Sequence, residues 1–285
     1  MNILVPTDFS EKANSALNYS LSLFKGKSCV FYLLSIRETS NYISDELLQS
    51  DANESLYDSL ILKNRKKLDQ LVKELESQYH GEDYTFKTIA DYNGFTDAIN
   101  QVISLEKIDL VVMGSNGAWG AKEMIFGSHS LRVIRKVPAP VLVVPKDYLY
   151  HGLERILLSL DYDQVFVPSE IAPLQKIIPR TQAFVEFLQM KSKNFDEVLW
   201  KDKSEKFKKS FSDLKFTFQT ITGVSFVAAV ISVVQIKKPD ILVLQAEEEN
   251  FLERLFHSSS ISSMIKKTTI PVLILHPTPE KEENS

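Results

Sequence analysis

The sequence predicts an α/β fold of two tandem, doubly wound domains, each with a five-stranded, mainly parallel sheet and helices on both faces. Three observations predict it: an internal repeat, an alternation of strand-like and helix-like segments, and runs such as 29–36 that are apolar almost throughout. Parallel strands covered on both faces read as continuous apolar runs. Alternation of strands and helices favours parallel pairing through crossover helices.

The internal repeat appears as segments of similar sequence that lie 131 positions apart. Residues 109–113 match 240–244, residues 133–136 match 264–267, and residues 140–144 match 271–275; 240 − 109, 264 − 133 and 271 − 140 all equal 131. Upstream, residues 3–8 resemble 156–161. Matches in the same order indicate duplication. We therefore predict two domains, 1–147 and 148–285, which meet in the polar and aromatic stretch 146–153.

Each element of the first repeat follows from its local pattern. Ser10 is a suitable N-cap for a helix whose buried stripe would be Ala13, Ala16, Leu17, Leu21 and Phe24. We expect strands at 2–6, 29–36, 84–90, 110–113 and 141–144, a long solvated helix within the charged segment 43–79, and a helix at 94–105. The second repeat is predicted to be shorter, with Pro173 and Pro179 interrupting its first helical region.

Composition narrows the classes of function. A length of 285 residues suits two domains, and a net charge of −4 argues against a general nucleic-acid binder. Cys29 is the one cysteine, so no internal disulfide can form and a reducing compartment fits. The first eight residues lack the pattern of a signal peptide, and no apolar run is long enough to cross a membrane. We expect a cytoplasmic protein that binds neither nucleic acid nor membranes.

The strongest functional pattern is a glycine-rich stretch containing Gly114, Gly117 and Gly127, followed by Ser128. It comes after the apolar strand 110–113 and leads into a helix-like segment ending in Lys136. Glycines let the backbone approach a ligand closely, and N–H groups at a helix start attract anions. The stretch therefore predicts a site for the phosphates of a nucleotide.

Two other strands should end beside this stretch. Asp8 and Ile36 each follow or close a predicted strand, as Gly114 does. In doubly wound sheets, ligands bind beyond the carboxyl ends of the strands. We expect all three residues to line one crevice.

The spacing resembles the ATP-binding signature of the universal stress protein family, Gly-x2-Gly-x9-Gly-Ser/Thr, and the first repeat satisfies every position of it. Residues 5–10 and 138–144 resemble the start and the finish of a family domain. The resemblance extends over the whole chain and is to the tandem two-domain form of the family. It implies a Rossmann-like fold of the adenine nucleotide alpha hydrolase type.

The resemblance implies an adenine nucleotide as ligand, ATP or else AMP or ADP, with or without Mg²⁺. It implies that the nucleotide-binding positions are Pro6, Thr7 and Asp8 for adenine and ribose, Ile36 for the adenine edge, Met113 and Gly114 alongside the nucleotide, and Gly117, Gly127, Ser128 and Ser130 for the phosphates.

The second repeat departs from this signature. At the 131-residue offset, Gln245, Glu248 and Ser258 replace the three glycines, while Ser259 keeps the serine. Three consecutive carboxylates at 247–249 would repel a triphosphate. We predict that the second repeat does not bind ATP.

Simpler interpretations stay open beside the functional one. The glycines could serve as turns only, Asp8 could only stabilise a helix N-terminus, and His129 is expected to be a solvated surface side chain. The histidines show no metal-ligand spacing, so no structural zinc is expected, and no catalytic constellation stands out.

The leading hypothesis is therefore a nucleotide-binding stress-response regulator rather than a metabolic enzyme. Slow ATP hydrolysis and a nucleotide-free scaffold acting through protein contacts are the alternatives. The second domain would act as a built-in partner, with strands 141–144 and 272–275 paired across a pseudo-two-fold axis. An unknown regulatory protein could read the nucleotide state, and a further homodimer stays open.

Overall fold

The computed structural model describes residues 1–36, 53–91, 94–117, 124–125, 133–134, 136–160, 168–178, 183–191, 195–210, 214–245 and 268–276. The first half contains β1 (Asn2–Pro6), α1 (Glu11–Leu23), β2 (Cys29–Ile36), α2 (Asn53–Gln78), β3 (Tyr84–Asp91), α3 (Phe95–Glu106), β4 (Leu110–Gly117), β5 (Met124–Ile125) and β6 (Val141–Pro145). The second half contains β7 (Arg155–Leu160), α5 (Pro168–Ile177), β8 (Phe184–Met190), α6 (Glu197–Ser210), β9 (Lys215–Ile221), α7 (Phe226–Lys237), β10 (Ile241–Gln245) and β11 (Val272–Leu275).

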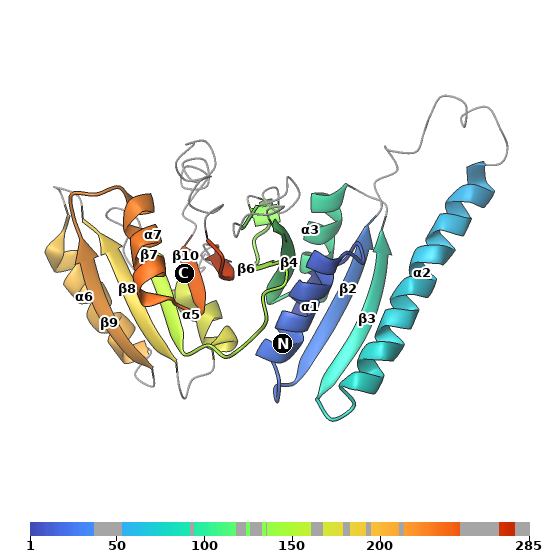
Figure 1. Cartoon of the computed structure of the whole chain (residues 1–285), viewed down its shortest axis with the longest axis horizontal. Helices are drawn as coiled ribbons and strands as arrows, with labels where there is room; N and C mark the ends of the chain where they lie inside the picture. The colour runs from blue at the N-terminus through green and yellow to red at the C-terminus, as the bar shows by residue number, and fades with distance from the viewer. Residues whose placement is uncertain are drawn as a thin grey trace, which may run out of the picture.

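One sheet runs through both halves in the order β3-β2-β1-β4-β6-β11-β10-β7-β8-β9. Within each half the strands along this path pair in parallel. Figure 1 shows the two halves side by side, with α2 beyond the outer edge of one and α6 at the outer side of the other. The predicted class, two tandem doubly wound α/β units, is confirmed.

The two halves join through their fifth main strands, as the sequence predicted. β6 and β11 pair antiparallel, with Leu142 opposite Leu273. Val141 pairs with Ile274 and Val143 with Val272, so each strand presents the same positions to the other. This reciprocal register places a local two-fold axis at the Leu142–Leu273 pair. Both leucines are fully buried, and neither strand is left as an open sheet edge.

The sheet separates two apolar cores. On one face, side chains of α1, α2 and α5 pack on alternate strand residues such as Ile3 and Val5. On the other face, α3 and α7 pack on the intervening residues, such as Leu4. Alternation along the strands explains why β1 is apolar throughout.

The 131-residue offset is visible in backbone geometry as well as in sequence. Lys107 ends α3 in the left-handed conformation with φ 49°, and Lys238, 131 positions later, ends α7 with φ 48°. Upstream, the second half is shorter, as expected, but the prediction that Pro173 interrupts its first helix was wrong, because Pro173 lies inside α5; Pro179 lies outside the described residues. Cys29 and Tyr84 open β2 and β3 at a separation of 55 residues, whereas Phe184 and Lys215 open β8 and β9 at a separation of 31.

Most local predictions for the first half hold. Ser10 caps α1 by accepting from the Ala13 N–H, and the predicted stripe is buried. The long charged helix exists as α2, but it is not simply solvated, because Asn64, Leu68 and Leu75 are buried. Residues 43–52 of the predicted segment lie outside the described residues.

One boundary prediction was wrong. β4 does not end at Met113 but continues to Gly117, and Asn116 and Gly117 pair antiparallel with β5. Gly114 therefore lies within a strand rather than in a loop, because β6 extends the pairing to Gly114 and Ser115.

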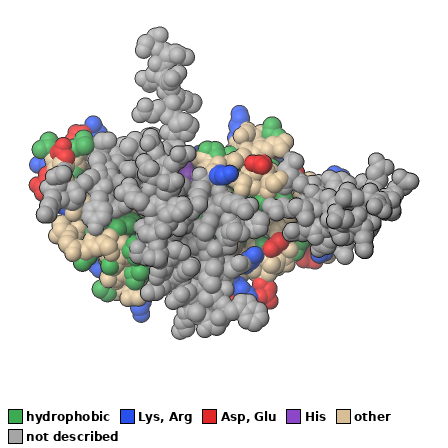
Figure 2. Space-filling view, turned by 90° about the horizontal axis from the view of Figure 1, so that it is seen from above, with side chains coloured by type: hydrophobic (Ala, Val, Ile, Leu, Met, Phe, Trp, Pro, Cys, Tyr) green, Lys and Arg blue, Asp and Glu red, His purple; other side chains and the backbone are tan. Residues whose placement is uncertain are grey.

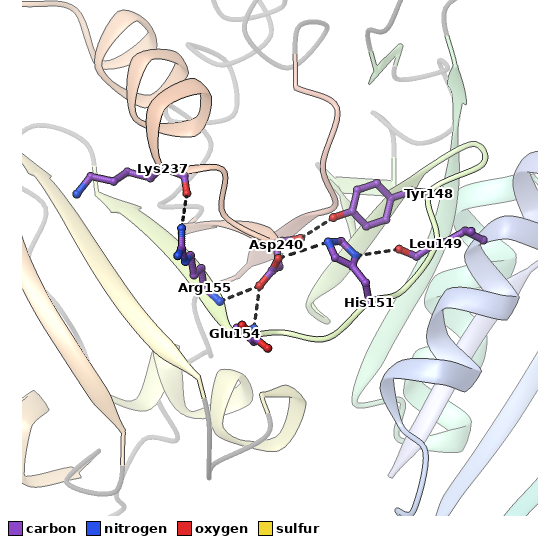
Figure 3. Close-up of polar contacts among 7 residues, drawn as sticks. All are labelled: Tyr148, Leu149, His151, Glu154, Arg155, Lys237 and Asp240. Carbon is purple, nitrogen blue, oxygen red and sulfur yellow. Dashed lines mark hydrogen bonds and ion pairs between the residues drawn. The ribbon is translucent and has the colours of Figure 1, made fainter.

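The connection between the halves is anchored by Asp240, which lies just before β10 (Figure 3). Its carboxylate accepts from the N–H groups of Glu154 and Arg155, both at 2.8 Å, and lies 3.5 Å from His151 Nε2. Tyr148 donates its hydroxyl to the Asp240 carbonyl at 3.4 Å. The chain between β6 and β7 is thus tied to the second half.

The same connection also packs on the first half. The rings of Tyr148 and Tyr150 lie 5.9 and 5.4 Å from the ring of Tyr19, which is buried on α1.

In the part of the chain that the structure describes, no helix is long and apolar enough to span a membrane.

Candidate functional site

The predicted site residues in the described part of the first half gather at the carboxyl edge of the sheet. β1 pairs with β4 with Ile3 opposite Leu110, and the same register brings Thr7 level with Gly114. On the other side of β1, the Thr7 N–H donates to the Leu34 carbonyl at 2.7 Å, two residues before Ile36 ends β2. Strand register therefore brings Pro6, Thr7, Asp8, Ile36, Met113 and Gly114 to the same edge of the sheet, while their contact with a nucleotide stays a prediction.

The turn between β1 and α1 holds Asp8 in a defined orientation. Thr7 is buried, and its hydroxyl oxygen accepts from the Phe9 N–H at 3.0 Å. Phe9 has φ 61°, an uncommon conformation for a bulky residue. Ser10 donates both its N–H, at 3.1 Å, and its hydroxyl to Asp8 Oδ1. The chain thus fixes Asp8 with local hydrogen bonds while its side chain stays 57% exposed.

The carboxyl group of Asp8 is held in its ionised form. Partial burial alone would raise its pKa, but the hydrogen bonds from Ser10 and the charge of Lys12, 3.7 Å away, outweigh burial. The net pKa lies below the ordinary value. An exposed, ionised and oriented carboxylate is a good acceptor for hydroxyl groups of a ligand.

Gly114 also has a structural role, which the sequence pattern did not predict. A Cβ at this position would lie 2.2 Å from the Lys12 carbonyl oxygen and 2.5 Å from the Lys12 carbonyl carbon. The α1 backbone therefore crosses β4 too closely for any side chain. Glycine at 114 sets the distance of α1, and with it Asp8, from β4.

The remaining phosphate-binding candidates lie beyond Gly114. Gly117 belongs to the short β4–β5 pairing. Gly127, Ser128 and Ser130 lie outside the described residues, as does the start of the helix expected after them. Residues 133, 134 and 136 are helical, and Val133 and Ile134 are fully buried.

Figure 2 looks onto the molecule from above, the side toward which β2 and β3 point in Figure 1. Described side chains of both charges are visible on this side. Within the described ranges, no group of three or more His, Cys, Asp or Glu side chains is arranged to hold a metal ion.

Sequence reasoning missed Phe9 and Lys12 at this site. Phe9 carries the strained turn beside Asp8, and no sequence pattern predicts a positive φ at phenylalanine. Lys12, one turn into α1, contributes its charge to Asp8 and its carbonyl to the contact with Gly114. Its i,i+4 spacing from Asp8 was the available signal.

The second half differs at the same edge. Gln245, which corresponds to Gly114, is buried at the end of β10. A side chain is therefore accommodated where the first half permits none. Residues 246–267, which contain the three consecutive glutamates, lie outside the described residues.

These features define a class of protein: doubly wound α/β units paired into one sheet, with Asp8 and Gly114 at the carboxyl ends of the strands. Residues 1–145 match the sequence profile of the Universal stress protein family, and the chain belongs to that family. The tandem arrangement accounts for a chain about twice the length of a single family domain.

Among curated relatives, the chain is 30% identical over 156 residues to universal stress protein MJ0577 of Methanocaldococcus jannaschii, covering 50% of this chain and 94% of the relative. It is 25% identical over 154 residues to MJ0531 of the same organism, covering 50% of this chain and 81% of the relative. Each of these matches therefore spans half of this chain and most of the relative.

Solved structures share the whole two-unit fold. A universal stress protein from Archaeoglobus fulgidus superposes with a TM-score of 0.71 at 17% identity, covering 96% of this chain and 97% of its own. A protein of unknown function from Pseudomonas aeruginosa superposes with a TM-score of 0.60 at 14% identity, covering 97% and 92%. At these identities the likeness concerns the fold alone.

Proposed function

We propose that this protein is a stress-response regulator whose first domain, residues 1–147, binds an adenine nucleotide, with ATP as the leading candidate. Family membership supports the role in stress response. The second domain, residues 148–285, would act as a fixed partner and would not bind ATP.

The observation that carries this proposal is the register of β1 and β4. It sets the exposed carboxylate of Asp8 and the glycine signature that begins at Gly114 at the same edge of the sheet. A ribose needs a hydrogen-bond acceptor, and phosphates need N–H and O–H donors. Asp8 would accept from the ribose hydroxyls, and the backbone from Gly117 to Ser130 would donate to the phosphates.

A fluorescence titration tests the proposal directly. Trp119 lies in the sequence between Gly117 and Gly127 and would report on a bound nucleotide, with Trp200→Phe removing the second tryptophan. Phenylalanine suits position 200, because the indole packs on Phe218 at 5.4 Å and its buried Nε1 has no hydrogen-bond partner among the described residues. We expect a saturable change with ATP, measured with and without Mg²⁺.

Asp8→Asn is the matched perturbation, because an amide keeps the oxygen that accepts from Ser10 and loses the charge. We expect it to weaken ATP binding about tenfold or more, the loss of a charge-assisted hydrogen bond. Asp161→Asn makes the same change at the corresponding position of the second repeat and should leave binding unchanged. Gly117→Val should abolish the fluorescence change.

The alternatives give different results in the same experiments. No fluorescence change, together with no thermal shift at millimolar ATP, would favour a nucleotide-free scaffold. Saturating ligand at about 100 times its dissociation constant should stabilise the fold by roughly 2.7 kcal/mol. Phosphate release above that of Asp8→Asn would indicate slow hydrolysis, and equal release would exclude it.

A further inference from the structure

The helical residues Val133, Ile134 and Lys136 come just before Pro138, which leaves one carbonyl of this turn without its regular donor. Within it, the Val137 N–H donates to the Val133 carbonyl at 3.0 Å, as in a regular α-helix. The next bond of the series would run from residue 138 to the Ile134 carbonyl. Residue 138 is Pro138, which has no N–H to donate. The Ile134 carbonyl is buried and needs another donor.

The donor comes from the other half of the molecule. His276 Nε2 lies 2.7 Å from the Ile134 carbonyl oxygen, across 142 positions of the chain. A carbonyl can only accept, so Nε2 carries the proton. Burial lowers the pKa of His276, against the opposing effect of the Ile134 and Ala139 backbone, and favours the neutral ring.

The pairing of β6 with β11, the seam between the halves, explains why His276 lies beside the Ile134 carbonyl. The antiparallel register of β11 on β6 sets Ile274 opposite Val141, and its continuation sets His276 opposite Ala139. Both residues are buried, His276 with 9% and Ala139 with 4% of its surface exposed. The imidazole is therefore held beside the end of the helix by the same strand pairing that joins the halves.

The first half has no equivalent donor at the position that matches His276. By the 131-residue offset, the position in the first half that matches His276 is Pro145, which offers no donor. The residue that matches Pro138 is Thr269, which has an N–H of its own. The repeat whose carbonyl accepts the hydrogen bond from His276 is the first one, which has the intact glycine signature.

We infer that His276 is a positioning residue for the nucleotide loop of the first domain, because it closes, from the second domain, the helix into which that loop leads. The inference rests on the proposed function and extends it to regulation of that site. By binding the Ile134 carbonyl, the second domain would fix the helical turn that follows the nucleotide loop. A substitution at His276 would then alter nucleotide affinity although the residue does not contact the nucleotide.

Two substitutions separate the hydrogen bond from the bulk of the side chain. His276→Leu removes the donor and leaves the buried Ile134 carbonyl without a partner. His276→Gln keeps an N–H donor at about the distance of Nε2. In the full chain, we expect His276→Leu to raise the ATP dissociation constant about threefold to tenfold, and His276→Gln to stay within about twofold of wild type.

Lys176→Gln provides the control, because it breaks another contact between the halves. Lys176 Nζ lies 2.8 Å from Asp109 Oδ1, and neither residue belongs to the predicted site. We expect this variant to leave the ATP dissociation constant within about twofold of wild type. Calorimetric titration of the full-length variants measures these constants, and the thermal midpoint of each variant records its stability separately.

Equal ATP affinity in folded His276→Leu and wild type would overturn the inference. If His276→Leu does not fold, His276→Asn replaces it, because asparagine sets its donor too close to the backbone to reach Ile134; affinity equal to that of His276→Gln would again overturn it. If the wild type binds no ATP, the proposed function fails, and the inference is judged on Trp119 emission without nucleotide. That emission should change in His276→Leu and stay constant in Lys176→Gln.

Discussion

Replacement of Gly114 by alanine tests how tightly the candidate site is built into the fold. The new Cβ would lie 2.2 Å from the Lys12 carbonyl oxygen, whereas ordinary contacts begin near 3.4 Å. The start of α1 or β4 would have to move by about 1.2 Å (3.4 − 2.2) to admit one methyl group. Both elements are packed in the core, so the motion would disturb buried contacts rather than solvent.

The expected loss of unfolding free energy is about 3 kcal/mol, the upper part of the range for overpacked cores. With a urea dependence of about 3 kcal/mol per molar, the unfolding midpoint should fall by about 1 M. Urea titration followed by circular dichroism measures the shift. Gly81→Ala is the matched control, because no atom lies within 4 Å of the Cβ it would add. Its midpoint should change by less than about 0.3 M.

A Gly114→Ala midpoint within 0.3 M of wild type would refute the close approach of α1 to β4. The expected destabilisation also affects the design of binding experiments. A Gly114 variant that fails to bind ATP could simply have lost the placement of Asp8. For this reason Asp8→Asn is the sharper test of the nucleotide site.

Three further outcomes follow from the described contacts. Ser10→Ala should destabilise the fold by about 1 kcal/mol in urea titration, through loss of the α1 N-cap; no change would mean that the cap is dispensable. Leu273→Ala, at the centre of the seam, should cost about 3 kcal/mol by the same measurement, and a loss below 1 kcal/mol would argue against a packed seam. Burial alone would raise the pKa of Asp109, but the hydrogen bonds from Lys176 and the Asn2 N–H outweigh burial and lower it. Because the pKa of Asp109 is lowered in the folded protein, the ionised carboxylate stabilises the fold above about pH 3.8, and this stabilisation is lost as the pH falls further. Lys176→Met should therefore make the melting temperature less sensitive to acid between pH 5 and 3. An unchanged pH profile would contradict the role of Lys176 beside Asp109.

The sequence predicted the repeat, the positions and parallel pairing of the strands in each unit and the pairing of the fifth strands, because these depend on regular apolar patterning; the spatial order of the strands was not predicted. It misplaced the end of β4, since glycines at 114 and 117 indicated a loop while pairing with β6 and β5 keeps both residues extended. It could not predict the Gly114 contact with Lys12, which depends on how two elements cross.

At the candidate nucleotide site, too, the sequence predicted what depends on strand register and missed what depends on contacts between distant elements. Its strand-end residues, such as Asp8 and Gly114, are brought together by register, which parallel patterning predicts. The link from His276 to Ile134 was beyond prediction, because it joins residues 142 positions apart whose types carry no shared motif. Only Pro138 hinted that a carbonyl nearby would need an outside donor.

The reciprocal seam has a consequence for how this molecule can vary. In a symmetric dimer of two identical chains, every substitution appears twice, once on each side of the axis. Here the two sides are encoded separately, so His276 and Pro145 can occupy matching places and do different things. A glycine can be kept at 114 while glutamine fills 245. Because one chain encodes both halves, a locally two-fold arrangement can hold non-equivalent residues, and a substitution on one side does not reappear on the other.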